Sequence, residues 1–65
     1  MKILLNGVWH ETTAIDLEKA LQEFGYASAV VATAVNGEFV PVVARARLAV
    51  HDGDRVEVLA PMQGG

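Results

Sequence analysis

The sequence contains no cysteine, few basic residues and no long apolar run. The absence of cysteine excludes a disulfide framework, a thiolate zinc site and a thiol nucleophile. Five Lys and Arg stand against eight Asp and Glu, giving a net charge of −3, which argues against nucleic-acid binding and favours a protein partner with a basic face. No stretch approaches the roughly 20 apolar residues of a membrane span. We therefore expect no membrane partner and a cytoplasmic location.

The length bounds the kind of protein. With 65 residues, 52% of them hydrophobic and 20% charged, the chain has the composition of one folded domain. A core of this size cannot also enclose a large catalytic cleft. We expect a protein that enzymes act on, and no enzyme activity of its own.

Two hairpins are predicted from turn signals. Each contains an Asn-Gly pair, which readily adopts the positive φ angles of a two-residue type I′ turn between strands. The first pairs strands at 1–5 and 8–12, and the second pairs strands at 29–35 and 38–40, the latter closed by Pro41.

A short helix is predicted between the hairpins. Asp16 can accept hydrogen bonds from the first turn, and Gly25 can end the helix about nine residues later. Such a helix is stable only when its apolar face packs against a sheet. That face consists of Leu17, Ala20, Leu21 and Phe24.

The last strand is predicted at 55–60, after a turn in which Asp52 and Asp54 flank a glycine. Alternation places Val56, Val58 and Ala60 inward. Residues 42–51 show no clean period and are interpreted as a connecting segment with one helical turn. The resulting order is β-β-α-β-β-β.

This order and three segments resemble the ThiS-like sulfur carriers of thiamin biosynthesis, relatives of ubiquitin. The segments are 1–7 (MKILLNG), 36–41 (NGEFVP) and 52–65, which ends in Pro-Met-Gln-Gly-Gly. The resemblance implies an α+β fold of the β-grasp type, with a mixed four- to five-stranded sheet and one short helix on one face. It implies a domain at 1–60 and a flexible tail at 61–65. One departure is Val42, where the family commonly has a basic residue.

The resemblance also implies the chemistry of Gly64 and Gly65. An E1-like adenylating enzyme activates the Gly65 carboxylate with ATP, a persulfide donor supplies sulfur, and the resulting thiocarboxylate serves a thiazole synthase. The chain binds no cofactor itself and acts as a co-substrate. The residues support this role, because glycine lets a backbone enter a narrow channel and adopt any φ, and because no internal thiol competes for the activated acyl group.

Alternatives to this function remain open. The chain could be the sulfur-carrying subunit of a molybdopterin synthase, or a ubiquitin-like modifier or binding module, since a fold does not determine function. Two terminal glycines also occur by chance in about one chain in 200.

A docking patch is predicted on the outer face of the sheet. Alternation turns Leu4 and Leu59 outward, and the Asn-Gly turn makes Trp9 the cross-strand partner of Leu4. Because the first and last strands are neighbours in a β-grasp sheet, we expect these three to form one apolar patch, to which we add Met62 and Gln63 of the tail as partner-binding residues. The alternative is that they are scattered surface residues and that Trp9 folds under the sheet edge.

Two pairs of polar residues receive ordinary interpretations. His10 and His51 lie far apart in a chain without cysteine, so we predict no metal site. Arg45 and Arg47 are interpreted as solvated side chains on the connecting segment, with partner contact as the alternative.

Overall fold

The computed structural model describes residues 1–27 and 29–60, and the predicted tail at 61–65 lies outside them. Two strands come first, β1 (Lys2–Leu5) and β2 (Val8–Glu11), followed by helix α1 (Leu17–Glu23). The second hairpin and the remaining elements are β3 (Ala32–Val35), β4 (Glu38–Val40), the 3₁₀ helix η1 (Val42–Arg47) and β5 (Arg55–Leu59).

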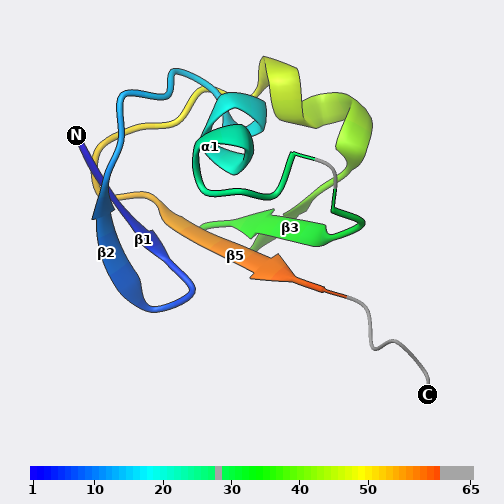
Figure 1. Cartoon of the computed structure of the whole chain (residues 1–65), viewed down its shortest axis with the longest axis horizontal. Coiled ribbons are helices and arrows are strands. Elements are labelled where there is room, and N and C mark those ends of the chain that lie inside the picture. Colours follow the sequence, from blue (N-terminus) through cyan, green and yellow to red (C-terminus); the bar gives the residue numbers. More distant parts are fainter. Residues whose placement is uncertain (28, 61–65) are drawn as a thin grey trace.

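The five strands form one mixed sheet in the order β2-β1-β5-β3-β4. Strand β5 lies in the middle, parallel to β1 and antiparallel to β3, while α1 and η1 both cover one face of the sheet (Figure 1). The predicted α+β class, the mixed sheet and the contact between first and last strands are confirmed.

Both Asn-Gly turns have the predicted geometry. In the first, φ is 49° at Asn6 and 83° at Gly7; in the second, it is 52° at Asn36 and 86° at Gly37. Two successive positive φ angles define the type I′ turn, whose twist matches that of the flanking strands. The turns fix the register of the two hairpins.

Helix α1 begins after Asp16, as predicted, and ends at Glu23, so it has seven residues where about nine are expected. Asp16 accepts a 2.8 Å hydrogen bond from the backbone N–H of Lys19, and Gly25 follows the helix with φ of 90°. The predicted apolar face is buried or packed on the core. A helix this short depends on that packing, which contributes about 1.5–3 kcal/mol for each fully buried leucine.

The segment after β4 is more regular than predicted. Residues 42–47 form a six-residue 3₁₀ helix, two turns where one is expected, starting after Pro41 with its φ of −68°. Ala44 and Leu48 pack against the core. The contact with the core, which no local pattern reveals, stabilises this helix.

Four strand limits differ from the prediction. Strand β1 starts at Lys2 instead of Met1, and β2 ends at Glu11 instead of Thr12. Strand β3 starts at Ala32 instead of Ala29, and β5 ends at Leu59. Ala60 is therefore exposed beyond the strand, and its predicted inward position is wrong. Alternation holds only while the chain is paired with a neighbouring strand.

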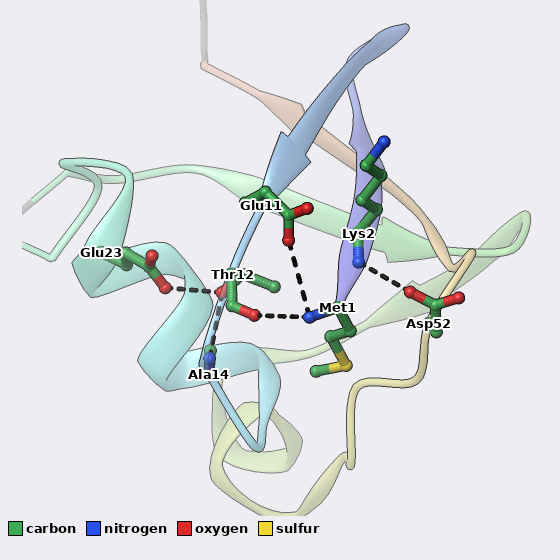
Figure 2. A network of polar contacts seen from close by, with 7 residues as sticks. All are labelled: Met1, Lys2, Glu11, Thr12, Ala14, Glu23 and Asp52. Carbon is green, nitrogen blue, oxygen red and sulfur yellow. Dashed lines mark hydrogen bonds and ion pairs between the residues drawn. The ribbon is translucent and has the colours of Figure 1, made fainter.

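A polar network joins the end of β2 to α1 and β1 (Figure 2). The buried Thr12 hydroxyl donates to the Glu23 carboxylate and accepts a 3.0 Å hydrogen bond from the N–H of Ala14. The Met1 ammonium donates to the Thr12 carbonyl at 3.2 Å and lies 3.7 Å from the Glu11 carboxylate. The network holds the turn from sheet to helix in place.

Across residues 1–27 and 29–60, no helix is long and apolar enough to cross a membrane.

Candidate functional site

The outer face of the sheet is the face that α1 and η1 leave uncovered (Figure 1). The strand registers place on it one set of alternating residues from every strand, opposite to the side chains that enter the core. These outer residues are Glu11 and Trp9 on β2, Lys2 and Leu4 on β1, Arg55, Glu57 and Leu59 on β5, Ala32 and Ala34 on β3, and Phe39 on β4.

An apolar groove, which we call the outer groove, lies where β5, β3 and β4 meet. It is a hollow of about 250 Å³. Ala32 pairs with Leu59 and Ala34 pairs with Phe39, so small side chains lie between two large ones. Leu59 and Phe39 are 73% and 70% exposed. The full lining is Asn6, Ala32, Thr33, Ala34, Phe39, Glu57, Val58 and Leu59.

The single patch predicted from Leu4, Trp9 and Leu59 is wrong as a geometric arrangement. Leu4 does pair with Trp9, as predicted. The neighbour of Leu4 on β5, however, is Arg55, and Leu59 lies four residues further along the strand, about 13 Å away at 3.3 Å per residue. The outer face therefore carries two apolar areas, with Arg55 and Glu57 between them.

Trp9 lies on the outer face and is 56% exposed, so the alternative in which it folds under the sheet edge is wrong. Its register position opposite Leu4 is set by the two-residue turn. The Leu4–Trp9 pair forms the second apolar area. Met62, Gln63, Gly64 and Gly65, the other predicted site residues, lie outside the described residues.

Sequence reasoning missed Phe39, although a signal was present. Val40 is buried in the core, so its neighbour in the strand must point to the opposite face. Phe39 was treated only as part of a strand. Its pairing with Ala34 places an aromatic ring at one side of the outer groove.

The side chain of Asn6 is the second missed feature. It grips β5 at Val58 by two hydrogen bonds: Val58 N–H donates to Oδ1 at 2.8 Å, and Nδ2 donates to the Val58 carbonyl at 3.1 Å. The side chain of Asn36 in the second turn makes one such bond at the start of β5, where Arg55 N–H donates to Oδ1 at 3.0 Å, while its Nδ2 donates to the Asp54 side chain. An Asn-Gly turn signal predicts the backbone conformation of the asparagine, but it does not predict the hydrogen-bond partners of the side chain.

Arg45 does not have the solvated position predicted for it. Its Nη2 donates to the Val31 carbonyl at 2.7 Å, and its Nε donates to Thr33 Oγ1 at 3.2 Å. Arg47 is exposed, as expected. Arg45 therefore attaches η1 to β3, and its position depends on the phase of a helix that the sequence did not reveal.

The remaining polar candidates have structural contacts. Asp52 accepts a 2.7 Å hydrogen bond from the N–H of Lys2 (Figure 2). Asp54 accepts hydrogen bonds from His51 N–H at 2.8 Å and from Asn36 Nδ2 at 3.0 Å, and the bond to His51 confirms the turn-forming interpretation of Asp54. The described part of the chain holds no group of three metal-ligating side chains.

Comparison with known proteins identifies the family. The model of the ThiS family matches residues 3–65. A crystal structure of the thiamine biosynthesis protein ThiS from Geobacter metallireducens superposes with a TM-score of 0.81 at 33% identity, covering 100% of both chains. A solution structure of a thiamine biosynthesis protein from the same organism gives a TM-score of 0.80 at 29% identity, over 100% of this chain and 88% of the other.

A thiazole synthase from Paramagnetospirillum magneticum is 39% identical over 66 residues. The match covers 100% of this chain and 20% of that protein, so the chain spans about a fifth of the length of this relative. The structural match confirms the predicted β-grasp fold. The chain belongs to the ThiS family, the sulfur carriers of thiamin biosynthesis.

Proposed function

We propose that this carrier is adenylated at the carboxylate of Gly65, converted to a thiocarboxylate, and used as the sulfur donor in thiazole formation. The observation that supports this most directly is that the family match runs through Gly64 to Gly65. The chain is then a co-substrate, and the catalysts are its partners.

The chemistry requires activation because a carboxylate is ionised at neutral pH and is a poor electrophile. An oxygen of Gly65 attacks the α-phosphorus of ATP on an E1-like enzyme, and pyrophosphate leaves. The terminal sulfur of a persulfide then attacks the acyl carbon, and AMP leaves. A second thiol cleaves the acyl disulfide, becoming part of a disulfide itself and releasing the thiocarboxylate. Since the chain has no cysteine, every thiol that takes part in these reaction steps belongs to a partner protein.

We assign docking to the outer groove, with Leu59 and Phe39 as its anchors. Apolar side chains over a floor of small residues fit the kind of pocket in which interface energy concentrates. Leu59 is also the last residue of β5, so a partner bound here lies where the chain continues toward Gly65. The Leu4–Trp9 pair, Met62 and Gln63 are proposed as additional partner contacts.

We propose that the partner that consumes the sulfur is a thiazole synthase. A relative that bears this name contains a segment matching the whole of this chain, which supports physical association between carrier and synthase. Because activation consumes ATP, we assign the reaction to the cytoplasm. No nucleic acid or membrane takes part.

Intact-mass spectrometry tests the proposal. The purified chain is incubated with ATP, its adenylating enzyme and a persulfide donor, and replacement of one oxygen by sulfur at Gly65 is expected. Deletion of Gly65 should abolish the mass change without altering the unfolding midpoint, because the core is built from residues 3–58. A truncated chain that still carries sulfur would contradict the proposal.

The same measurement separates the alternatives. A ubiquitin-like modifier would give isopeptide adducts on other proteins and no thiocarboxylate. A carrier for molybdopterin would form the thiocarboxylate but would supply sulfur to a molybdopterin synthase and not to a thiazole synthase.

A further inference from the structure

The pairing between β1 and β5 stops before β5 ends. The ladder runs through Leu5 and Val56, with a last backbone hydrogen bond of 2.9 Å from Asn6 N–H to the Val56 carbonyl. The chain then turns back at Gly7. Strand β5 nevertheless continues to Leu59, so its last residues extend past the main chain of β1.

The side chain of Asn6 replaces the missing main chain. Its amide is both acceptor and donor for Val58, at 2.8 Å and 3.1 Å, so one side chain satisfies the N–H and the C=O that two residues of a longer parallel β1 would otherwise bond. On the other side of β5, Leu59 pairs with Ala32 of β3. The end of β5 is therefore bonded on both sides, by strand β3 on one side and by the side chain of Asn6 alone on the other.

We propose that Asn6 is a positioning residue for the reaction at Gly65. It fixes the end of β5, and thereby the point from which the chain leads to the reacting carboxylate. This inference rests on the proposed function. Each residue released from the strand lengthens the free segment before Gly65 by as much as about 3.6 Å. It also adds backbone conformational entropy, which is lost when the carboxylate is placed at ATP.

Asn6 also borders the outer groove, so a direct contact with the partner has to be distinguished from positioning. Its amide already bonds both polar groups of Val58, which favours the positioning role. A positioning residue affects the step after docking, and a contact residue affects docking itself. Loss of a positioning residue should therefore lower kcat, whereas loss of a contact residue should raise KM.

The chain contains its own matched control. Asn36 occupies the same place in the other type I′ turn, with φ of 52° against 49° for Asn6, and its side chain grips the opposite end of β5 at Arg55. Glycine accepts both φ angles. Asn6→Gly and Asn36→Gly thus each remove an asparagine side chain that bonds β5 from a type I′ turn, the second also removing a hydrogen bond to Asp54, and only the first loosens the end that leads to Gly65.

The first measurement is amide hydrogen exchange of the folded full chain. We expect Asn6→Gly to speed exchange at Val58 and Leu59 by about tenfold or more relative to Val56, because the strand end opens locally. Asn36→Gly should leave exchange at Val58 and Leu59 unchanged, because it loosens only the start of β5 at Arg55. Unchanged exchange at Leu59 in Asn6→Gly would overturn the proposal.

The second measurement is steady-state adenylation by the activating enzyme with ATP, at a temperature where all variants are folded. We expect Asn6→Gly to lower kcat about tenfold, the loss that corresponds to ordering about one additional residue, with KM changed less than about threefold. Asn36→Gly should change both constants less than about threefold. Equal losses in kcat for the two variants, or a rise in KM alone for Asn6→Gly, would overturn the proposal.

The two measurements also separate this inference from the proposed function. If the wild-type chain is not adenylated, the proposed function fails, and with it the positioning role at Gly65. If the wild-type chain is adenylated and Asn6→Gly keeps a normal kcat, the carrier function stands and the role of Asn6 is refuted.

Discussion

Arg45 on η1 donates a 2.7 Å hydrogen bond to the carbonyl of Val31, the residue that leads into β3. Val31 is buried, and the guanidinium is half-buried. The bond joins the 3₁₀ helix to the sheet, and Arg45 also reaches Thr33. Arg45, a charged residue on a segment without clear periodicity, therefore has a structural role.

We expect Arg45→Ala to lower the free energy of unfolding by about 2 kcal/mol, since hydrogen bonds from a charged donor contribute more than neutral ones. Urea unfolding measures the change. Arg47→Ala, on the exposed neighbour, is the control and should change stability by less than about 0.5 kcal/mol. Equal effects of the two substitutions would contradict the structural role of Arg45.

Removal of the helix cap should be visible in stability. Asp16→Ala deletes the acceptor of the 2.8 Å hydrogen bond from Lys19 N–H, and we expect a loss of about 1 kcal/mol. Asp16→Asn keeps an acceptor oxygen and should lose only a few tenths. Thermal unfolding of the two variants gives the comparison, and a loss as large in Asp16→Asn would rule out capping as the cause.

The buried Thr12 hydroxyl tests the network of Figure 2. Thr12→Val keeps the shape but removes the hydroxyl that bonds Glu23 and Ala14 N–H. We expect a loss of about 1–3 kcal/mol, because a buried backbone donor is left without a partner. Thr12→Ser, which retains the hydroxyl, is the control in chemical denaturation. Wild-type stability of the valine variant would show that the network contributes nothing net.

Substitutions in the outer groove should lower the rate of adenylation without lowering the stability of the fold. Leu59→Ser and Phe39→Ser change exposed side chains, so the unfolding midpoint should hardly move. If these residues anchor the partner, kcat/KM for adenylation should fall about tenfold or more. Trp9→Ser, on the other apolar area, is the comparison. A larger effect at Trp9 would place docking on the β1–β2 half of the face.

The sequence predicted those parts of the fold that short-range chemistry controls. Both Asn-Gly turns, the Asp16 cap and the Gly25 stop depend on a few neighbouring residues, and all are found. The order of helix and strands followed from the turn signals and periodicity, and the contact between the first and last strands followed from the family resemblance. These features do not require knowledge of distant contacts.

The errors concern contacts between distant segments. The alternation predicted for β1 and β5 is found except at Ala60, which lies beyond β5. The relative register of the two strands is not predictable from the alternation, and only the pairing of Leu4 with Arg55 shows how far Leu59 lies from Leu4. The helical phase of 42–47, and with it the position of Arg45, depends in the same way on packing against the core.

Strand β5 lies at the centre of the sheet and is the last strand of the described chain. During synthesis it leaves the ribosome after both hairpins, and each hairpin alone is at best marginally stable. Its contacts with β1 and the turn that follows join positions as far apart as Asn6 and Val58, which are separated by 52 residues. Sheet formation must therefore wait for β5 and then close long loops at once, which predicts slow, cooperative folding.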